Sequence, residues 1–288
     1  MTGFAAIALK VAAFVLGLAF GSFLNVVIFR LPREGLALDR PRRSFCPICA
    51  APIGWRDNIP VLSWLLLKGR CRSCHSRVSW RYPLVELVAA FLSLFVFQVE
   101  GLTVRYFLTL YFLLCLTAVA FIDLEHLIIP DGLVIPTIVW GVILAVLDPL
   151  PYLVGDNYWF ALLDMGWNPR LIGLVGAAFS FILGFGILFL TGFLYQRVRG
   201  RVGLGDGDPP LMGLIGVYLG WMAVFPVLFL SSVLALLSVG VLALTGRGTE
   251  EGPIALRPVP FGPFLALAAL IWSFFGPAIF AWYFNLFA

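Results

Sequence analysis

Long apolar stretches separated by short charged loops dominate the sequence. The first covers residues 4–29 and is interrupted only by Lys10, Ser22 and Asn25. A helix needs roughly 17 to 25 apolar residues to cross the hydrocarbon core of a bilayer, which is about 30 Å thick. Hydrophobic residues make up 61% of the chain and charged residues 12%, whereas soluble domains contain roughly 25% charged residues. This composition excludes a soluble globule, a disordered chain and a small disulfide-rich domain, and it predicts an all-α polytopic membrane protein.

The apolar stretches predict about eight transmembrane helices. They cover residues 4–29, 84–99, 106–122, 133–147, 171–195, 211–244 and 261–287. The stretch 211–244 is too long for one crossing, and Gly220, Trp221 and Pro226 divide it into a short helix, a turn and a second helix. The first stretch lacks the basic start and the cleavage site of a signal peptide, so we expect it to be retained. The expected domains are a first transmembrane helix (1–29), a cytoplasmic domain (30–82) and a transmembrane domain (83–288).

The distribution of basic residues predicts the orientation in the membrane. Residues 30–82 contain eleven Lys and Arg, residues 196–209 contain three and residues 245–260 contain two, so sixteen of the nineteen lie in alternate loops. Because cytoplasmic loops are enriched in Lys and Arg, we place these loops in the cytoplasm and both termini outside. The loop 148–169 has three aspartates and no basic residue, which suits the outer face. Anionic lipid explains the basic loop, and no nucleic-acid-binding signature is present.

Four of the five cysteines form two C-x2-C pairs with 21 residues between them: Cys46, Cys49, Cys71 and Cys74. Two such knuckles typically bring four thiolates to one tetrahedral Zn²⁺, and a site closed by four sulfurs is structural, not catalytic. The alternatives are free thiols or disulfides, but a reducing cytoplasm disfavours disulfides. A loop of this length has too small a core to fold without such a link. We expect His75 to be a bystander and Cys115 to be an apolar packing residue.

Three aspartates lie at the predicted cytoplasmic boundary of the membrane. Asp123 ends the third apolar stretch, and Asp206 and Asp208 lie in a glycine-rich turn; 82 residues separate Asp123 from Asp206. Ionisable groups at membrane depth are functional candidates, although a single aspartate at a helix end is more often a simple interfacial charge. Two carboxyls brought close together can share a proton, so that one acts as a base on water and the other as an acid. The sequence does not show whether these side chains meet.

A set of motifs follows a recognisable order. The set comprises GSFLNVVIFRLP at 21–32, the two C-x2-C pairs with NIPVLSW at 58–64 between them, RYPLVEL at 81–87, IDL at 122–124, IPD at 129–131 and the G-x-G-D turn. Together these motifs resemble the bacterial type IV prepilin peptidases. The resemblance implies a GxGD intramembrane aspartic endopeptidase of the inner membrane, which cleaves the leader from type IV prepilins and type II secretion pseudopilins at the cytoplasmic face. Its partners would be the N-terminal helices of these substrates and membrane lipid.

The resemblance also implies roles for individual residues. Matched position by position, Asp123 and Asp208 are the catalytic pair, the four cysteines hold the zinc ion of the cytoplasmic domain, and residues 83–288 form the peptidase domain. Many family members also methylate the new N-terminal residue with S-adenosylmethionine. Methylation rests on the resemblance alone, because the sequence contains no Rossmann-type methyltransferase motif. The site of the methyl donor is left unassigned.

The catalytic aspartate of the glycine-rich turn has to be chosen from two overlapping G-x-G-D frames, one ending at Asp206 and the other at Asp208. Family members have a glycine eight residues after the catalytic aspartate, and Gly216 stands in that relation to Asp208. The two prolines after Asp208 also predict that it is the N-cap of the next helix. We therefore assign Asp208 and keep Asp206 as the alternative. The family commonly has lysine where this chain has Pro210.

Two other classes of function fit part of the pattern. A proton-coupled transporter could use Asp123 and Asp208 as a relay, but both lie at one face of the membrane and no inverted repeat is visible. A non-enzymatic scaffold could dock through the cysteine loop, but it leaves the paired aspartates unexplained.

Five further polar residues fall in the matching family segments near the junctions between the loop and the membrane. The alternatives are contact with the cofactor, or pairing with one another and anchoring at the interface, and we expect the latter. They are Asn25, Arg33, Glu34, Arg81 and Glu86.

Overall fold

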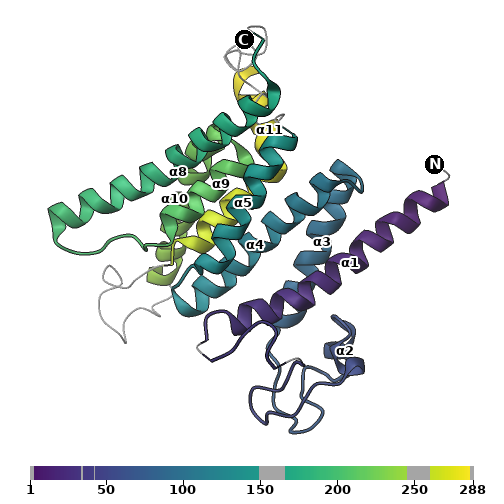
Figure 1. The fold of residues 1–288 in the computed structure, drawn as a ribbon. Helices are drawn as coiled ribbons and strands as arrows, with labels where there is room; N and C mark the ends of the chain where they lie inside the picture. Colours follow the sequence, from purple (N-terminus) through teal and green to yellow (C-terminus); the bar gives the residue numbers. More distant parts are fainter. Residues whose placement is uncertain (1–2, 34, 42, 149–165, 245–259, 286–288) are drawn as a thin grey trace. The chain divides into compact units, whose positions relative to one another are not determined.

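The computed structural model describes residues 3–33, 35–41, 43–148, 166–244 and 260–285 (Figure 1). The regular elements among these residues are helices, and the only β pairing among them is two isolated bridges in the cysteine loop. The predicted all-α class is therefore confirmed. The chain divides into two compact units, Met1–Ala118 and Val119–Ala288, and the division falls within helix α4 (Val104–His126).

The N-terminal unit is built on two long helices and the loop between them. Its elements are α1 (Gly3–Arg30), η1 (Trp55–Asn58), α2 (Leu62–Leu66), α3 (Arg81–Glu100) and the first part of α4. Helices α1 and α3 lie side by side (Figure 1). A Cβ on Gly21 of α1 would lie 2.6 Å from the Cα of Glu86 on α3, and one on Gly17 would lie 2.6 Å from the Cα of Ala90. Small residues thus allow close approach of the two backbones, as in other membrane helix pairs.

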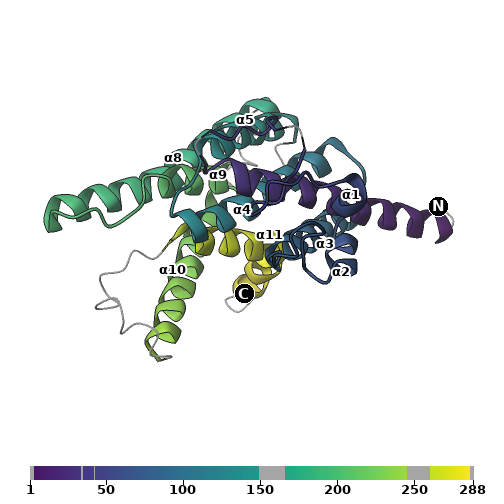
Figure 2. The ribbon, with the colours of Figure 1, turned by 90° about the horizontal axis from the view of Figure 1, so that it is seen from below.

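The C-terminal unit contains the end of α4 and five further helices. These are α5 (Asp131–Leu147), α8 (Pro169–Arg199), α9 (Asp208–Leu219), α10 (Trp221–Leu244) and α11 (Gly262–Asn285). Helix α9 contacts α5, α8, α10 and α11. A Cβ on Gly216 of α9 would lie 2.5 Å from the carbonyl oxygen of Ser180 on α8, so these two backbones also touch. The last turns of α8 project beyond the other helices of this unit, and residues 200–207 lead back to α9 (Figures 1 and 2).

Five helices of the described part are long and apolar enough to cross a membrane: α1, α3, α4, α8 and α10. Helix α5 and the residues Gly262–Gly276 of α11 are shorter apolar helices. Helix α9 has 12 residues, which corresponds to a length of about 18 Å and is less than the bilayer core of about 30 Å. The membrane character is confirmed, but the count of eight crossings is not. The predicted break at Gly220 is present, whereas Pro226 lies inside α10.

Some predictions concern residues outside the described ranges. They are Glu34, most of the acidic loop 148–169, the two arginines of the loop 245–260, and the end of the last apolar stretch at residue 287. The domain boundaries after residues 29 and 82 also stay predictions.

Candidate functional site

The two C-x2-C motifs come together in the N-terminal unit. The four Sγ atoms of Cys46, Cys49, Cys71 and Cys74 lie within 4.8 Å of one another, and those of Cys46 and Cys74 are 3.9 Å apart. Four thiolates around a tetrahedral Zn²⁺, with Zn–S bonds of about 2.3 Å, have sulfurs about 3.8 Å apart. The backbone N–H of Cys49 lowers the pKa of the Cys46 thiol to about 6, whereas the neighbouring sulfurs, that of Cys74 first, raise the pKa of the Cys49 thiol to about 11. The positions of the sulfurs are thus the evidence for a metal site. The cluster therefore fits a metal ion.

Each cysteine pair is carried by a turn of the same geometry. The N–H of Ala50 donates to the carbonyl of Cys46 at 2.9 Å, and the N–H of His75 donates to the carbonyl of Cys71 at 3.0 Å. Ala50 and His75 both adopt the left-handed conformation, with φ of 56°. His75 is thus the counterpart of Ala50 in the second turn, and the group of side chains that could hold a metal ion consists of the four cysteines. Cys115 is buried in α4, which agrees with a packing role.

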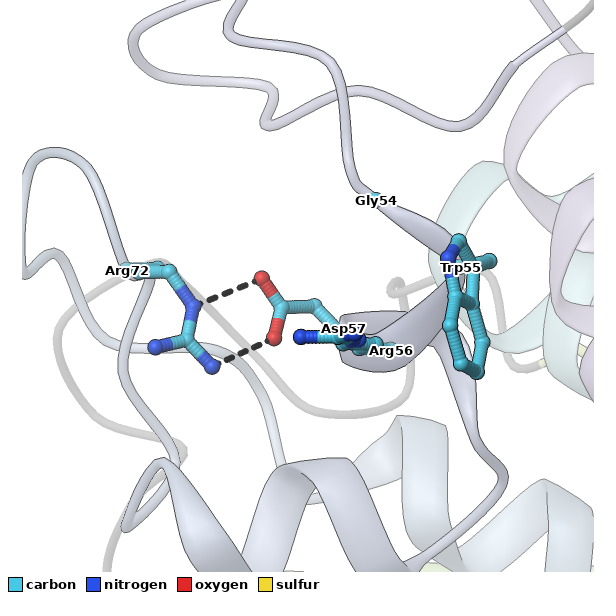
Figure 3. Close-up of a pocket in the computed structure, with 5 residues that line it drawn as sticks. All are labelled: Gly54, Trp55, Arg56, Asp57 and Arg72. Atoms are coloured by element: carbon cyan, nitrogen blue, oxygen red, sulfur yellow. Dashed lines mark hydrogen bonds and ion pairs between the residues drawn. The ribbon is translucent and has the colours of Figure 1, made fainter.

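An ion pair links the 3₁₀ helix η1 to the second cysteine motif (Figure 3). Nε and Nη2 of Arg72 donate to the two carboxylate oxygens of Asp57 at 2.8 and 2.6 Å. Hydrogen bonding to Arg72 lowers the pKa of Asp57. The same two residues line a pocket together with Gly54, Trp55 and Arg56. Asp57 was not assigned a role from the sequence, because its spacing from Arg72 follows no pattern that predicts an ion pair.

Polar side chains join the cysteine loop to α3, and α1 to α3. The carboxylate of Glu86 accepts the N–H of Val61 at 2.7 Å, and the amide of Asn25 donates to the carbonyl of Tyr82 at 3.0 Å. Arg33 donates to a backbone carbonyl of α1 and lies over the ring of Phe29. The prediction that the five polar residues pair with one another is therefore wrong for Asn25, Arg33 and Glu86, because their partners are mainly backbone groups.

A buried arginine at the end of α1 was not assigned a role from the sequence. The guanidinium of Arg30 donates to three backbone carbonyls at 3.0 to 3.2 Å, those of Ala37, Leu38 and Arg43. It orders the start of the cysteine loop. Arg81, at the start of α3, lies over the ring of Tyr82.

Asp123 and Asp208 lie in one neighbourhood of the C-terminal unit. Their side chains are almost fully buried, with 5% and 4% of the residue surface exposed. Ile129, which follows α4, packs against two glycines near them: a Cβ on Gly207 would lie 2.6 Å from the Cβ of Ile129, and one on Gly262 would lie 3.1 Å from its Cδ1. The structure therefore places Asp123 and Asp208, which are distant in the sequence, in the same neighbourhood.

Each of these aspartates accepts one hydrogen bond from a glycine N–H. Gly262 donates to Oδ2 of Asp123 at 3.1 Å, and Gly205 donates to Oδ2 of Asp208 at 3.0 Å. The predicted N-cap role of Asp208 is wrong, because the N–H of Leu211 donates to the carbonyl of Gly207 and the carboxylate turns back towards Gly205.

The alternative aspartate has different surroundings. Asp206 is exposed, two residues before the buried Asp208. Asp208 is buried in the same neighbourhood as Asp123, whereas Asp206 is exposed, and this difference favours Asp208 as the partner of Asp123.

Gly262 and Ile129 were not assigned a function from the sequence. Gly262 is 139 residues away from Asp123, and no local spacing rule connects them. The sequence around Gly262 predicts only the start of a helix, because Pro263 follows it at the beginning of the last apolar stretch.

The sequence matches two family descriptions that together cover most of the chain. Residues 15–99 match the bacterial peptidase A24 N-terminal domain, and residues 110–240 match the type IV leader peptidase family. The chain belongs to the type IV leader peptidase family. The cysteine cluster lies in the first matched region and both buried aspartates lie in the second, whereas Gly262 lies beyond both.

Curated members of the leader peptidase family align with nearly the whole chain. The prepilin leader peptidase/N-methyltransferase of Aeromonas salmonicida (strain A449) is 35% identical over 94% of this chain and 92% of its own length. The protein of the same name from Pseudomonas aeruginosa is 34% identical over 93% and 91%, and that from Dichelobacter nodosus is 30% identical over 91% and 90%. No solved structure matches the chain. None of these findings supports the transporter alternative.

Proposed function

We propose that the chain is a membrane aspartic endopeptidase with Asp123 and Asp208 as its catalytic pair. It removes the leader from type IV prepilins and type II secretion pseudopilins at the cytoplasmic face of the inner membrane. The observation that carries the proposal is the pair of buried carboxyl groups, each held by a backbone N–H, in a chain of the leader peptidase family.

The proposed reaction uses the two carboxyls in different protonation states. The ionised one takes a proton from a water molecule as the water oxygen attacks the scissile carbonyl carbon, and the protonated one gives its proton to the carbonyl oxygen. The tetrahedral intermediate then breaks at the C–N bond, and the leaving amine takes up a proton from the pair. Oδ1 of each aspartate has no hydrogen-bond partner among the described residues, so both oxygens are available for these transfers.

The position of Asp208 suits a substrate whose apolar helix follows the bond that is cut. Asp208 is the first residue of α9, and the turn before it exposes Gly203, Gly205 and Asp206. The basic residues of the predicted cytoplasmic loops favour an active site on that side of the membrane.

The cysteine cluster holds a structural zinc ion in this proposal. Its four sulfurs would complete the coordination shell and leave no position for a reacting water. The ion would fold the loop by joining two turns that are distant in sequence.

Methylation of the new N-terminal residue is the second activity we propose, on the strength of the names of the relatives. S-adenosylmethionine would supply the methyl group. The described residues form no strand, so they offer no strand-turn-helix site of the Rossmann type for this cofactor. We assign no residue to it.

Co-expression with a prepilin tests both activities. Mass spectrometry of the pilin N-terminus should show loss of the leader and a gain of one methyl group with the natural enzyme, and the intact precursor with Asp123→Asn. Uncleaved prepilin beside a folded natural enzyme would overturn the proposal.

A further inference from the structure

We propose that Gly262 is a positioning residue for Asp123, whose carboxylate it holds in the orientation needed for peptide cleavage. The inference rests on the proposed function and adds to it a residue outside both matched family regions.

Gly262 gives Asp123 a hydrogen bond that fixes one of its carboxylate oxygens. The N–H of Gly262 donates to Oδ2 of Asp123 at 3.1 Å in a buried contact, and no other residue of the described part donates to this carboxylate. Gly262 is the first residue of α11, where backbone N–H groups have no partner inside the helix. The donor is therefore free for Asp123, and the positive end of the helix faces the carboxylate.

The surroundings of Gly262 leave no room for a side chain at this position. A Cβ on Gly262 would lie 2.6 Å from Oδ2 of Asp123 and 3.1 Å from Cδ1 of Ile129. The nearest obstacle is thus the carboxylate, and any side chain at residue 262 would push it away from the donor. Only glycine allows the close approach of backbone and carboxylate seen here.

Asp208 is held in the same way as Asp123. Gly205 donates to Oδ2 of Asp208, and a Cβ on Gly205 would lie 3.1 Å from that oxygen. Each carboxyl therefore has one oxygen fixed by a glycine and one left for chemistry. Gly205 belongs to the recognised G-x-G-D turn, and Gly262 performs the corresponding task for Asp123.

The test compares Gly262→Ala with Gly186→Ala, because a Cβ on Gly186 of α8 would meet nothing within 4 Å. We expect Gly262→Ala to lower kcat for prepilin cleavage about 100-fold, because displacing a catalytic group by about 1 Å has an effect of this size. KM should stay within about twofold, since Gly262 lies against the aspartate and away from the surface. The Gly186→Ala enzyme should behave as the natural enzyme. Full activity of folded Gly262→Ala would overturn the inference while leaving the peptidase assignment intact.

A second substitution separates positioning from packing. Ile129→Val removes Cδ1 and so relieves the smaller of the two conflicts created by Gly262→Ala. We expect the double variant to stay as slow as Gly262→Ala, because the conflict with Oδ2 persists. Recovery of activity in the double variant would show that residue 262 acts through packing against Ile129 and would contradict the inference.

Two further measurements cover the remaining outcomes. If Gly262→Ala does not fold, glycolic acid at position 262 replaces the N–H by an ester oxygen without adding a side chain, and the same loss of kcat is expected. Infrared spectra with labelled aspartate report on the carboxyl without any activity. The band that is absent in Asp123→Asn should shift in Gly262→Ala and stay in place in Gly186→Ala, and an unshifted band would contradict the inference even if no prepilin is cleaved.

Discussion

The cysteine cluster and the aspartate pair are assembled in different ways. Three of the four cysteines remain partly or fully exposed, and each pair is shaped by its own turn, so that a metal ion can complete the site. Asp123 and Asp208 are buried, come from two helices and each accept a backbone N–H. The donor to Asp208 lies in the turn before it, but the donor to Asp123 is 139 residues away. The first site depends on a ligand and short-range spacing, whereas the second depends on the packing of the whole C-terminal unit.

This difference implies that the two sites can fail separately. Removing the metal should loosen the loop without moving the carboxyls, and replacing a carboxyl should stop the chemistry without loosening the loop.

The largest effect is expected for Asp123→Asn and Asp208→Asn. An amide can neither take a proton from water nor deliver one, so each variant should lower the cleavage rate by about 10³-fold or more. Both should retain the metal and the melting temperature of the natural protein in detergent. A cleavage assay with purified prepilin, together with metal analysis, checks this, and a rate near that of the natural enzyme in either variant would refute the catalytic pair.

Serine in place of any of the four cysteines should have the next largest effect. We expect the zinc content to fall from about one ion per chain to a small fraction, because thiolate coordination contributes most of the folding free energy of such loops. Limited proteolysis should then cut between the two cysteine motifs. Methylation should decrease more than cleavage, because the aspartates lie outside the loop.

Purified protein without metal, combined with serine variants as resistant to protease as the natural chain, would contradict this prediction. A rate of cleavage that falls in parallel with zinc content would instead show that the two sites are coupled.

A smaller effect is expected at the junction between the loop and α3. Glu86→Ala removes the acceptor for the N–H of Val61, a β-branched residue held at φ of 60°. Leaving that N–H without its partner should lower the free energy of unfolding by about 1 to 3 kcal/mol. Hydrogen exchange at Val61 should be faster in Glu86→Ala than in Glu86→Gln, which keeps an acceptor oxygen. Equal exchange in the two variants would remove the role assigned to this hydrogen bond.

The smallest effect is expected for Asp206→Asn, because this side chain is exposed. Peptidase activity should stay within about threefold of the natural value, as for most exposed positions. The same cleavage assay checks it. The reverse ranking, with Asp206→Asn inactive and Asp208→Asn active at equal stability, would move the active site to Asp206.

The sequence predicted those features that short-range rules control. The apolar stretches gave the helices, Gly220 gave the break between α9 and α10, and the C-x2-C spacing gave the cysteine cluster. Aspartates at helix ends could be named as candidates because charge is unfavourable at membrane depth.

The features that were missed or wrongly predicted depend on tertiary packing. The hydrogen bond from Gly262 to Asp123 spans 139 residues, so no local pattern encodes it. The N-cap prediction for Asp208 followed a correct general preference, but the preceding turn offered the N–H of Gly205 instead. The number of membrane crossings stayed open because α9 is apolar enough to count as a span in the sequence and too short to be one as a straight helix.

The burial of α9 has a consequence for the proposed substrate. Ten of its twelve residues are buried, in contact with α5, α8, α10 and α11. If Asp208 is catalytic, as proposed, a peptide would reach it through the exposed turn before α9 and not along the side of this helix. The bond that is cut would then belong to an unwound segment that leads into a helix. Such an enzyme would select substrates by where their helix begins, and it would spare a membrane protein that carries a similar peptide sequence within a helix.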